Sequence, residues 1–143
     1  MNIEKGYIIN LNRRNDRMIN FINKIGNKLD IPIERVEAVD GRLLTYDKTL
    51  LNRINPWNIV NNKPKRYGVI GCCMSHLEIY KKIKDKGESI FLVFEDDVDW
   101  SSDNKNLEKV LKLKFPKDWG IIFLNNRLSN PSVNKDYQVV GFK

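Results

Sequence analysis

The strongest constraint on the fold is a regular alternation of short apolar runs with amphipathic segments. The runs Tyr7–Leu11, Ile90–Phe94 and Gly120–Leu124 are unalternating and rich in β-branched and aromatic residues, as is typical of strands buried on both faces. After the first run, apolar residues recur at helical intervals: Met18, Phe21, Ile22, Ile25 and Leu29. Strands that alternate with helices predict an α/β fold, with a mostly parallel sheet and helices on both of its faces. At 143 residues, the chain is expected to form a single domain spanning 1–143.

Other segments complete this pattern. Arg35–Val39 reads as a second strand, ended by the Asp-Gly turn that follows it. A second helix is expected to open at residues 68–71 and stop near Gly87, with Met74, Leu77, Tyr80 and Ile83 on its apolar face. A short helix is expected over 107–113, and 137–142 is a candidate fifth strand. Residues 42–67 are the least regular part, and loops of this length are usually functional or mobile.

The composition excludes some classes of protein. Hydrophobic residues make up 41% of the chain and charged residues 30%, which is typical of a globular domain and not of a disordered tail. The net charge of +7 would attract nucleic acid, an anionic membrane or a nucleotide diphosphate. The excess is mostly scattered lysine, and no RNA- or DNA-binding motif accompanies it. Nucleic-acid binding is therefore a hypothesis that rests on charge alone.

The cysteines and the termini bear on the compartment. Cys72 and Cys73 are neighbours and cannot form a disulfide framework. Neither a CxxC pair nor a histidine-rich stretch indicates zinc, and the two cysteines are expected to be small buried residues more often than reactive thiols. Glu4 and the short apolar run after it do not resemble a signal peptide, and no stretch approaches the ~20 apolar residues of a membrane span. We expect a soluble protein in the reducing cytoplasm.

Three carboxylates, Glu95, Asp96 and Asp97, directly follow the strongest predicted strand. Two unit charges ~4 Å apart repel by about 4 kcal/mol at an effective dielectric near 20, so a cation is needed beside them. A lysine or arginine could serve, but a hard divalent ion would also recruit phosphate oxygens. Side chains alternate along an extended segment, so the ion would meet either Asp96 or the Glu95/Asp97 pair. The alternative is an acidic turn that caps the next helix.

Further polar residues follow the other predicted strands, where ligands bind in parallel α/β sheets. Arg13, Arg14 and Arg17 oppose the dipole of the helix that they begin, and an anionic ligand would relieve this, although a solvated helix start explains them nearly as well. Ser75 and His76 diverge by about 100° on a helix and cannot form a catalytic dyad. His76 could face a ligand from the first turns of its helix, or could be a packing residue.

Five segments in fixed order resemble signatures of glycosyltransferase family 25, the β-galactosyltransferases of lipooligosaccharide synthesis and of procollagen. The family patterns are INL-[DN]-RR-x-DR, R-x-x-A-V-D-G, G-C-x-x-S-H, EDD and W-D-x-x-x-L. The matching segments are Ile8–Arg14 with Asp16 and Arg17, Arg35–Gly41, Gly71–His76, Phe94–Val98 and Asp118–Leu124. The sequence departs from the family in two places, with Asn12 and Gly120 where Asp is frequent.

The resemblance implies a GT-A-type, Rossmann-like fold, a UDP-sugar donor carrying galactose or glucose, Mn²⁺, and transfer with inversion to a glycan or glycoprotein acceptor. The residues expected at the metal are Glu95, Asp96 and Asp97. Those expected at the donor are Asn12, Arg13, Arg17, Asp40, Ser75 and His76. An inverting transferase needs a general base, and the family's candidate, a later Asp, has no counterpart in this sequence. No catalytic residue is therefore assigned.

Two hypotheses follow for this chain. In the first it is the donor-binding portion of a hexosyltransferase, with a partner chain possible as the source of the acceptor half. In the second it is a truncated, non-catalytic relative that keeps the fold and nucleotide-sugar binding. Turnover of a UDP-sugar separates them.

Overall fold

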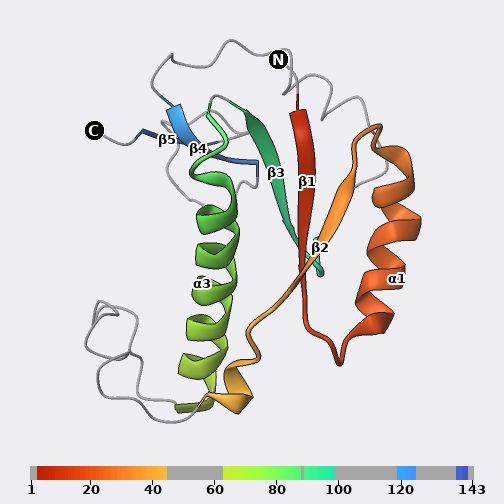
Figure 1. Ribbon diagram of the computed structural model, residues 1–143. Helices are drawn as coiled ribbons and strands as arrows, with labels where there is room; N and C mark the ends of the chain where they lie inside the picture. Colours follow the sequence, from red (N-terminus) through yellow and green to blue (C-terminus); the bar gives the residue numbers. More distant parts are fainter. Residues whose placement is uncertain (1–2, 45–62, 88, 99–118, 125–137, 142–143) are drawn as a thin grey trace. The chain divides into compact units, whose positions relative to one another are not determined.

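The computed structural model describes residues 3–44, 63–87, 89–98, 119–124 and 138–141 (Figure 1). The chain forms two compact units, residues 2–101 and residues 102–143, and each is described by itself. The prediction of one domain over residues 1–143 stays a prediction.

The first unit contains a three-stranded sheet. Its strands are β1 (Ile3–Asn10), β2 (Ile33–Glu37) and β3 (Ile90–Glu95), in the order β2-β1-β3 (Figure 1). Both neighbours run parallel to β1. All three strands therefore place their carboxyl ends at the same edge, which confirms the parallel sheet predicted from the apolar runs.

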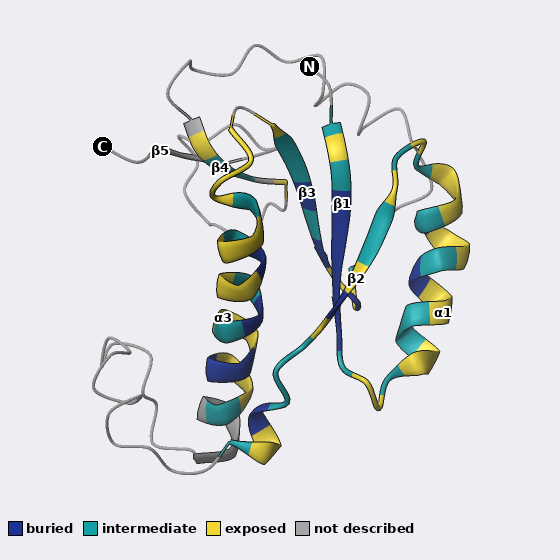
Figure 2. Ribbon diagram, viewed as in Figure 1, coloured by how far each residue is buried: buried dark blue, intermediate teal, exposed yellow. Residues whose placement is uncertain are grey.

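Helices cover both faces of this sheet, as predicted. The helix α1 (Asn15–Lys24), followed by the short 3₁₀ helix η1 (Gly26–Lys28), lies on one side of the strands, and α3 (Lys63–Ile83) lies on the other (Figure 1). Alternate strand residues serve the two faces. One core consists of Ile8, Phe21, Ile25, Leu92 and Phe94, and the other of Tyr7, Ile9, Val36 and Ile79. Figure 2 shows buried residues on the strands and on both helices. The α/β class is thereby confirmed.

The helix α3 differs from its prediction in two respects. It begins at Lys63, within the stretch expected to be irregular, and ends at Ile83, before Gly87 turns the chain with a φ of 69°. The apolar face was also partly wrong, because Leu77 is 53% exposed while Ile70 and Ile79 are buried. Two small residues on the buried face, Gly71 and Ser75, weaken the apolar pattern from which a helix face is predicted.

Those small residues allow a close backbone approach. The 3₁₀ helix η2 (Gly41–Leu43) follows β2, and a Cβ on Gly71 would meet the carbonyl oxygen of Val39 and lie 2.9 Å from the amide nitrogen of Gly41. The hydroxyl of Ser75 accepts a 2.9 Å hydrogen bond from the amide of Val39 and donates a 2.7 Å bond to the carbonyl of Gly71. Two of the recognised motifs, one ending at Gly41 and one beginning at Gly71, therefore form a single packed junction.

The second unit contains an antiparallel pair, β4 (Trp119–Phe123) and β5 (Gln138–Gly141). Both strands were predicted to within two residues. The helix expected over 107–113 and most of the irregular stretch, 45–62, lie outside the described residues. Among the helices that the structure describes, none is long and apolar enough to cross a membrane.

Candidate functional site

The polar residues that follow β1 and β3 meet at the carboxyl edge of the sheet. Asp96, only 9% exposed, lies one residue beyond β3, and the fully buried Asn10 is the last residue of β1. The side-chain amide of Asn10 donates a 2.7 Å hydrogen bond to Asp96 Oδ2 and a 2.9 Å bond to the backbone carbonyl of Arg14. Asn10 thus joins the turn after β1 to the acidic segment after β3.

Asn10 was not among the residues predicted for the site. It belongs to the first recognised segment, but the residue was assigned to a strand and its side-chain amide was given no role. A polar side chain that interrupts an otherwise apolar, fully buried run could have pointed to it, because such a group needs a hydrogen-bonding partner in the interior.

Arg17 supplies a positive charge to this edge from the first turn of α1. Its Nη1 lies 3.0 Å from Asp96 Oδ1 and 3.4 Å from Asp97 Oδ2. The expected alternation, with Glu95 and Asp97 on one side and Asp96 on the other, is wrong. The strand ends at Glu95 and the next two residues form a turn, so Asp96 and Asp97 share a partner while Glu95 contacts α3.

The first and second motifs also meet directly. Arg13 Nε donates a 2.8 Å bond to Asp40 Oδ2, and Arg42 contacts both oxygens of the same carboxylate. Asn12, the remaining predicted donor residue of this segment, hydrogen-bonds Glu37 and Arg35. The arginines that were predicted to bind an anionic ligand therefore pair with protein carboxylates in this structure.

The cations around Asp40 hold the pKa of its carboxyl well below the ordinary value, Arg42 through its side chain more than Arg13. We expect Arg42→Gln to raise the pKa of Asp40 further than Arg13→Gln does, since Arg42 contacts both carboxylate oxygens. The amide of Arg42 also donates to Asp40 Oδ1, so the double variant should still titrate below an ordinary aspartate. Carboxyl ¹³C chemical shifts measured against pH give the pKa of Asp40 in each variant. A higher pKa in Arg13→Gln than in Arg42→Gln would contradict this order.

Ser75 and His76, adjacent on α3, point in different directions. Ser75 is fully buried, and its hydroxyl is used in docking the helix onto Val39. Both hydrogen bonds of its hydroxyl are to backbone, and its expected role at the donor stays a prediction. His76 lies in the middle of the 21-residue α3, not in its first turns as expected, because the helix begins at Lys63.

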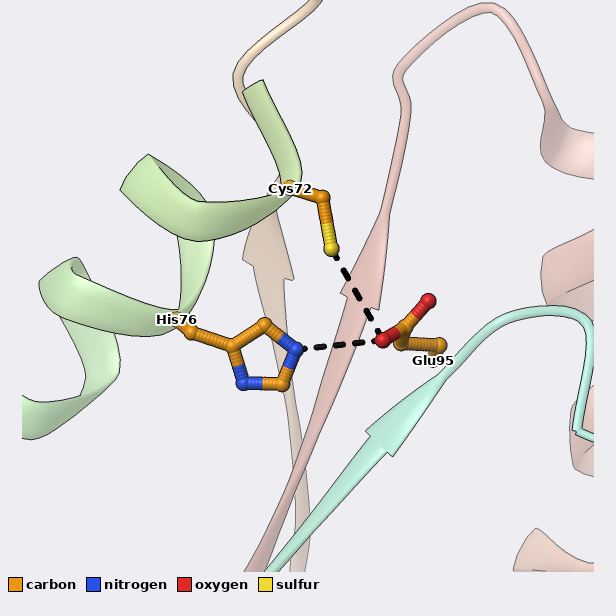
Figure 3. Close-up of side chains that lie close together, drawn as sticks. All are labelled: Cys72, His76 and Glu95. Atoms are coloured by element: carbon orange, nitrogen blue, oxygen red, sulfur yellow. Dashed lines mark hydrogen bonds and ion pairs between the residues drawn. The ribbon is translucent and has the colours of Figure 1, made fainter. Parts of the chain in front are cut away.

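A second cluster forms where α3 faces the end of β3. His76 Nε2 lies 3.2 Å from Glu95 Oε1, and the thiol of Cys72 lies 3.7 Å from the same oxygen (Figure 3). Hydrogen bonding raises the pKa of His76 to about 9, and Cys72 contributes more to this than Glu95 does. We call Cys72, His76 and Glu95 the Cys–His–Glu cluster. The cluster was not predicted, although Cys72 and His76 are four residues apart in the sequence. The expectation that both cysteines are buried was wrong, because Cys72 and Cys73 are exposed.

The fit of a hard divalent ion can be judged from these contacts. Oxygens of Asp96 and Asp97 already converge on one cationic nitrogen of Arg17, so a positive charge between them is favourable. Asp97 is exposed enough to reorient, with 60% of its side chain accessible. This oxygen set suits Mn²⁺ or Mg²⁺. Glu95 is not part of it in this arrangement, because its carboxylate contacts His76.

Comparison with known proteins agrees with the motifs. The model of the family described as "Glycosyltransferase family 25 (LPS biosynthesis protein)" matches residues 3–143. The chain belongs to glycosyltransferase family 25.

Individual members of family 25 cover most of this chain. Procollagen galactosyltransferase 2 of Mus musculus is 30% identical over an alignment of 141 positions, which covers 89% of the chain and 21% of that protein. Probable inactive glycosyltransferase 25 family member 3 of Bos taurus is 30% identical over 92% of the chain and 23% of its own length. Putative glycosyltransferase R655 of Acanthamoeba polyphaga mimivirus is 31% identical over 90% of the chain and 39% of its own length. The chain thus spans about a fifth of the length of the first two relatives.

Proposed function

We propose that this family 25 chain is the donor-binding portion of a hexosyltransferase. Its donor is a UDP-sugar, galactose or glucose, and its acceptor is a glycan or glycoprotein, with inversion at the anomeric carbon. The similarity to procollagen galactosyltransferases supports glycosyl transfer. The presence of a relative named as probably inactive keeps a non-catalytic role as the second candidate.

The observation that carries the proposal is the contact between the first and fourth motifs. Asn10 and Arg17, from the opening motif, hold Asp96 of the acidic triplet. Asn10 and Arg17 lie 86 and 79 positions from Asp96 in the sequence. The three residues nevertheless meet beyond the carboxyl ends of adjacent parallel strands. That is the position at which α/β sheets bind their ligands.

The roles proposed for the individual residues follow from the charges of their side chains. Asp96 and Asp97 would hold Mn²⁺, which as a Lewis acid neutralises negative charge on the UDP leaving group. Asn10 orients Asp96 through its amide hydrogen bond. Arg17 contacts Asp96 and Arg13 contacts Asp40, and both cations would turn from these carboxylates toward the diphosphate. Asp40 and Asn12 would line the donor side, with His76 on the flank formed by α3.

Calorimetry of UDP binding with and without Mn²⁺ tests the proposal. We expect binding by the native chain to depend on Mn²⁺, and Asp97→Asn to weaken it by about 10-fold or more, since a metal ligand matters at least as much as its supporting groups. Asp97 is exposed, so the fold should survive. Asp85→Asn, at a carboxylate 84% accessible near the end of α3, is the matched control and should bind as the native chain does.

The outcomes are distinct. If UDP binds equally well without Mn²⁺ and to Asp97→Asn, the metal assignment is wrong. If the native chain does not bind UDP at all, donor binding is wrong. Where binding holds, release of UDP from UDP-galactose in the presence of a collagen-type peptide indicates an enzyme, and the absence of turnover indicates the non-catalytic relative.

A further inference from the structure

We infer that the Cys–His–Glu cluster is a binding site for Zn²⁺ or a similar borderline divalent transition metal, distinct from the oxygen site of Asp96 and Asp97. The inference does not depend on the proposed glycosyl transfer. It rests on the placement of three chemically different ligands by two elements of the fold.

The helix α3 supplies two of the ligands at a spacing that brings them together. Residues four apart lie one above the other on the same helix face, so Cys72 and His76 project in the same direction. Glu95, the last residue of β3, completes the set from the facing strand (Figure 3). Within the described ranges, this is the one group of three or more His, Cys, Asp or Glu side chains whose ligand atoms gather closely, all within 4.8 Å of one another.

Two of the three ligand separations are close to the edges of a tetrahedral zinc site. With Zn–N and Zn–O bonds of about 2.1 Å and a Zn–S bond of about 2.3 Å, tetrahedral angles place N and O about 3.4 Å apart and S and O about 3.6 Å apart. The structure has 3.2 Å between His76 Nε2 and Glu95 Oε1, and 3.7 Å between Cys72 Sγ and that oxygen. The ligand atoms of Cys72 and His76 lie within 4.8 Å of each other, where a tetrahedral site needs about 3.6 Å, so a metal ion could enter after small side-chain movements.

The chemistry of the ligands selects the metal. A thiolate and an imidazole favour Zn²⁺, Co²⁺ or Cu²⁺ over Mn²⁺ and Mg²⁺, which prefer oxygen. Three protein ligands leave a fourth position open, and Cys72 and Glu95 are exposed, so the ion and an exchangeable water could reach the site from solvent. Two metal classes would therefore bind at neighbouring places, one through Glu95 and the other through Asp96 and Asp97.

Titration of the full 143-residue chain with Co²⁺ and Zn²⁺ tests this inference. Co²⁺ should produce a sulfur-to-metal charge-transfer band and intense visible transitions typical of tetrahedral coordination, and Zn²⁺ should displace it. Cys72→Ser should abolish the charge-transfer band. His76→Gln should weaken Zn²⁺ binding by about 100-fold or more, at the upper end of the losses seen when groups supporting a metal are removed.

Cys73 provides a matched control, because it is also an exposed free cysteine, one residue away, and is outside the cluster. Cys73→Ser should retain the band and the Zn²⁺ affinity of the native chain, and circular dichroism of each variant verifies the fold. The inference is overturned if native protein gives no band, or if Cys72→Ser and Cys73→Ser lose the same amount of it. UDP binding is not measured in this experiment, so its result is independent of the test in the previous section.

Discussion

Replacing Gly71 with alanine is expected to destabilise the protein by roughly 3 kcal/mol, the upper part of the range for overpacking a close contact. The new Cβ would overlap the carbonyl oxygen of Val39 and approach the amide nitrogen of Gly41 to 2.9 Å. Both obstacles are backbone atoms, so no rotamer change relieves the overlap. The helix would have to move away from the turn after β2, stretching the bond between Ser75 and Val39.

The same helix contains an internal control. Gly68 has no atom within 4 Å of its potential Cβ, so Gly68→Ala removes a flexible residue from a helix without a clash. We expect it to stabilise the protein by about 0.5–1 kcal/mol. Urea denaturation followed by circular dichroism measures both changes. Equal, small effects of the two substitutions would show that α3 does not pack closely on Gly41.

The second large effect is expected for Asn10→Asp. The substitution replaces the amide that donates to Asp96 with a second carboxyl in a buried position. At neutral pH we expect a loss of about 3–5 kcal/mol, the range measured when a buried charge is left without its partner. Asn20→Asp, at an exposed position of α1, is the control and should change stability by less than about 0.5 kcal/mol.

The pH dependence of Asn10→Asp separates charge repulsion from a packing defect. Two carboxyls in contact raise the folded-state pKa of one of them, because the charged form of the second is disfavoured. A raised acid pKa means that the folded state binds the extra proton, so the stability deficit is full above that pKa. It should shrink as the pH falls toward the ordinary aspartate value of about 3.9. A deficit that stays constant from pH 7 to about pH 4 would contradict the repulsion.

Much of the first unit could be predicted from the sequence, because its strands and α1 carry strong apolar periodicity. The run around Ile8 and Ile9 and the face containing Phe21 and Ile25 were identified correctly. The parallel arrangement then followed from the alternation of elements, as did the meeting of the first and fourth motifs at one edge of the sheet. In these strands and in α1 the apolar pattern of each segment agrees with its place in the sheet or on a face of the sheet.

The details of α3 and of the acidic triplet could not be predicted, for a shared reason. Both depend on contacts between residues far apart in sequence rather than on apolar spacing: α3 packs against distant backbone, and the triplet contacts distant side chains. Gly71 and Ser75 define the buried face of the helix by being small, which a hydrophobic pattern does not register. The alternation rule failed after Glu95 because the strand stops there. The sequence could not show that Asp96 pairs with Arg17, since an arginine and a metal ion would both neutralise the carboxylate.

The junction between α3 and the turn after β2 has a consequence for any ligand of this edge. Val39, whose amide is bonded to Ser75, immediately precedes Asp40, and Ser75 immediately precedes His76. The backbones that carry the Asp40 carboxylate and the His76 imidazole are therefore locked together before a ligand arrives. A molecule that used both groups would lose little affinity to ordering them, because that conformational entropy is already spent in folding.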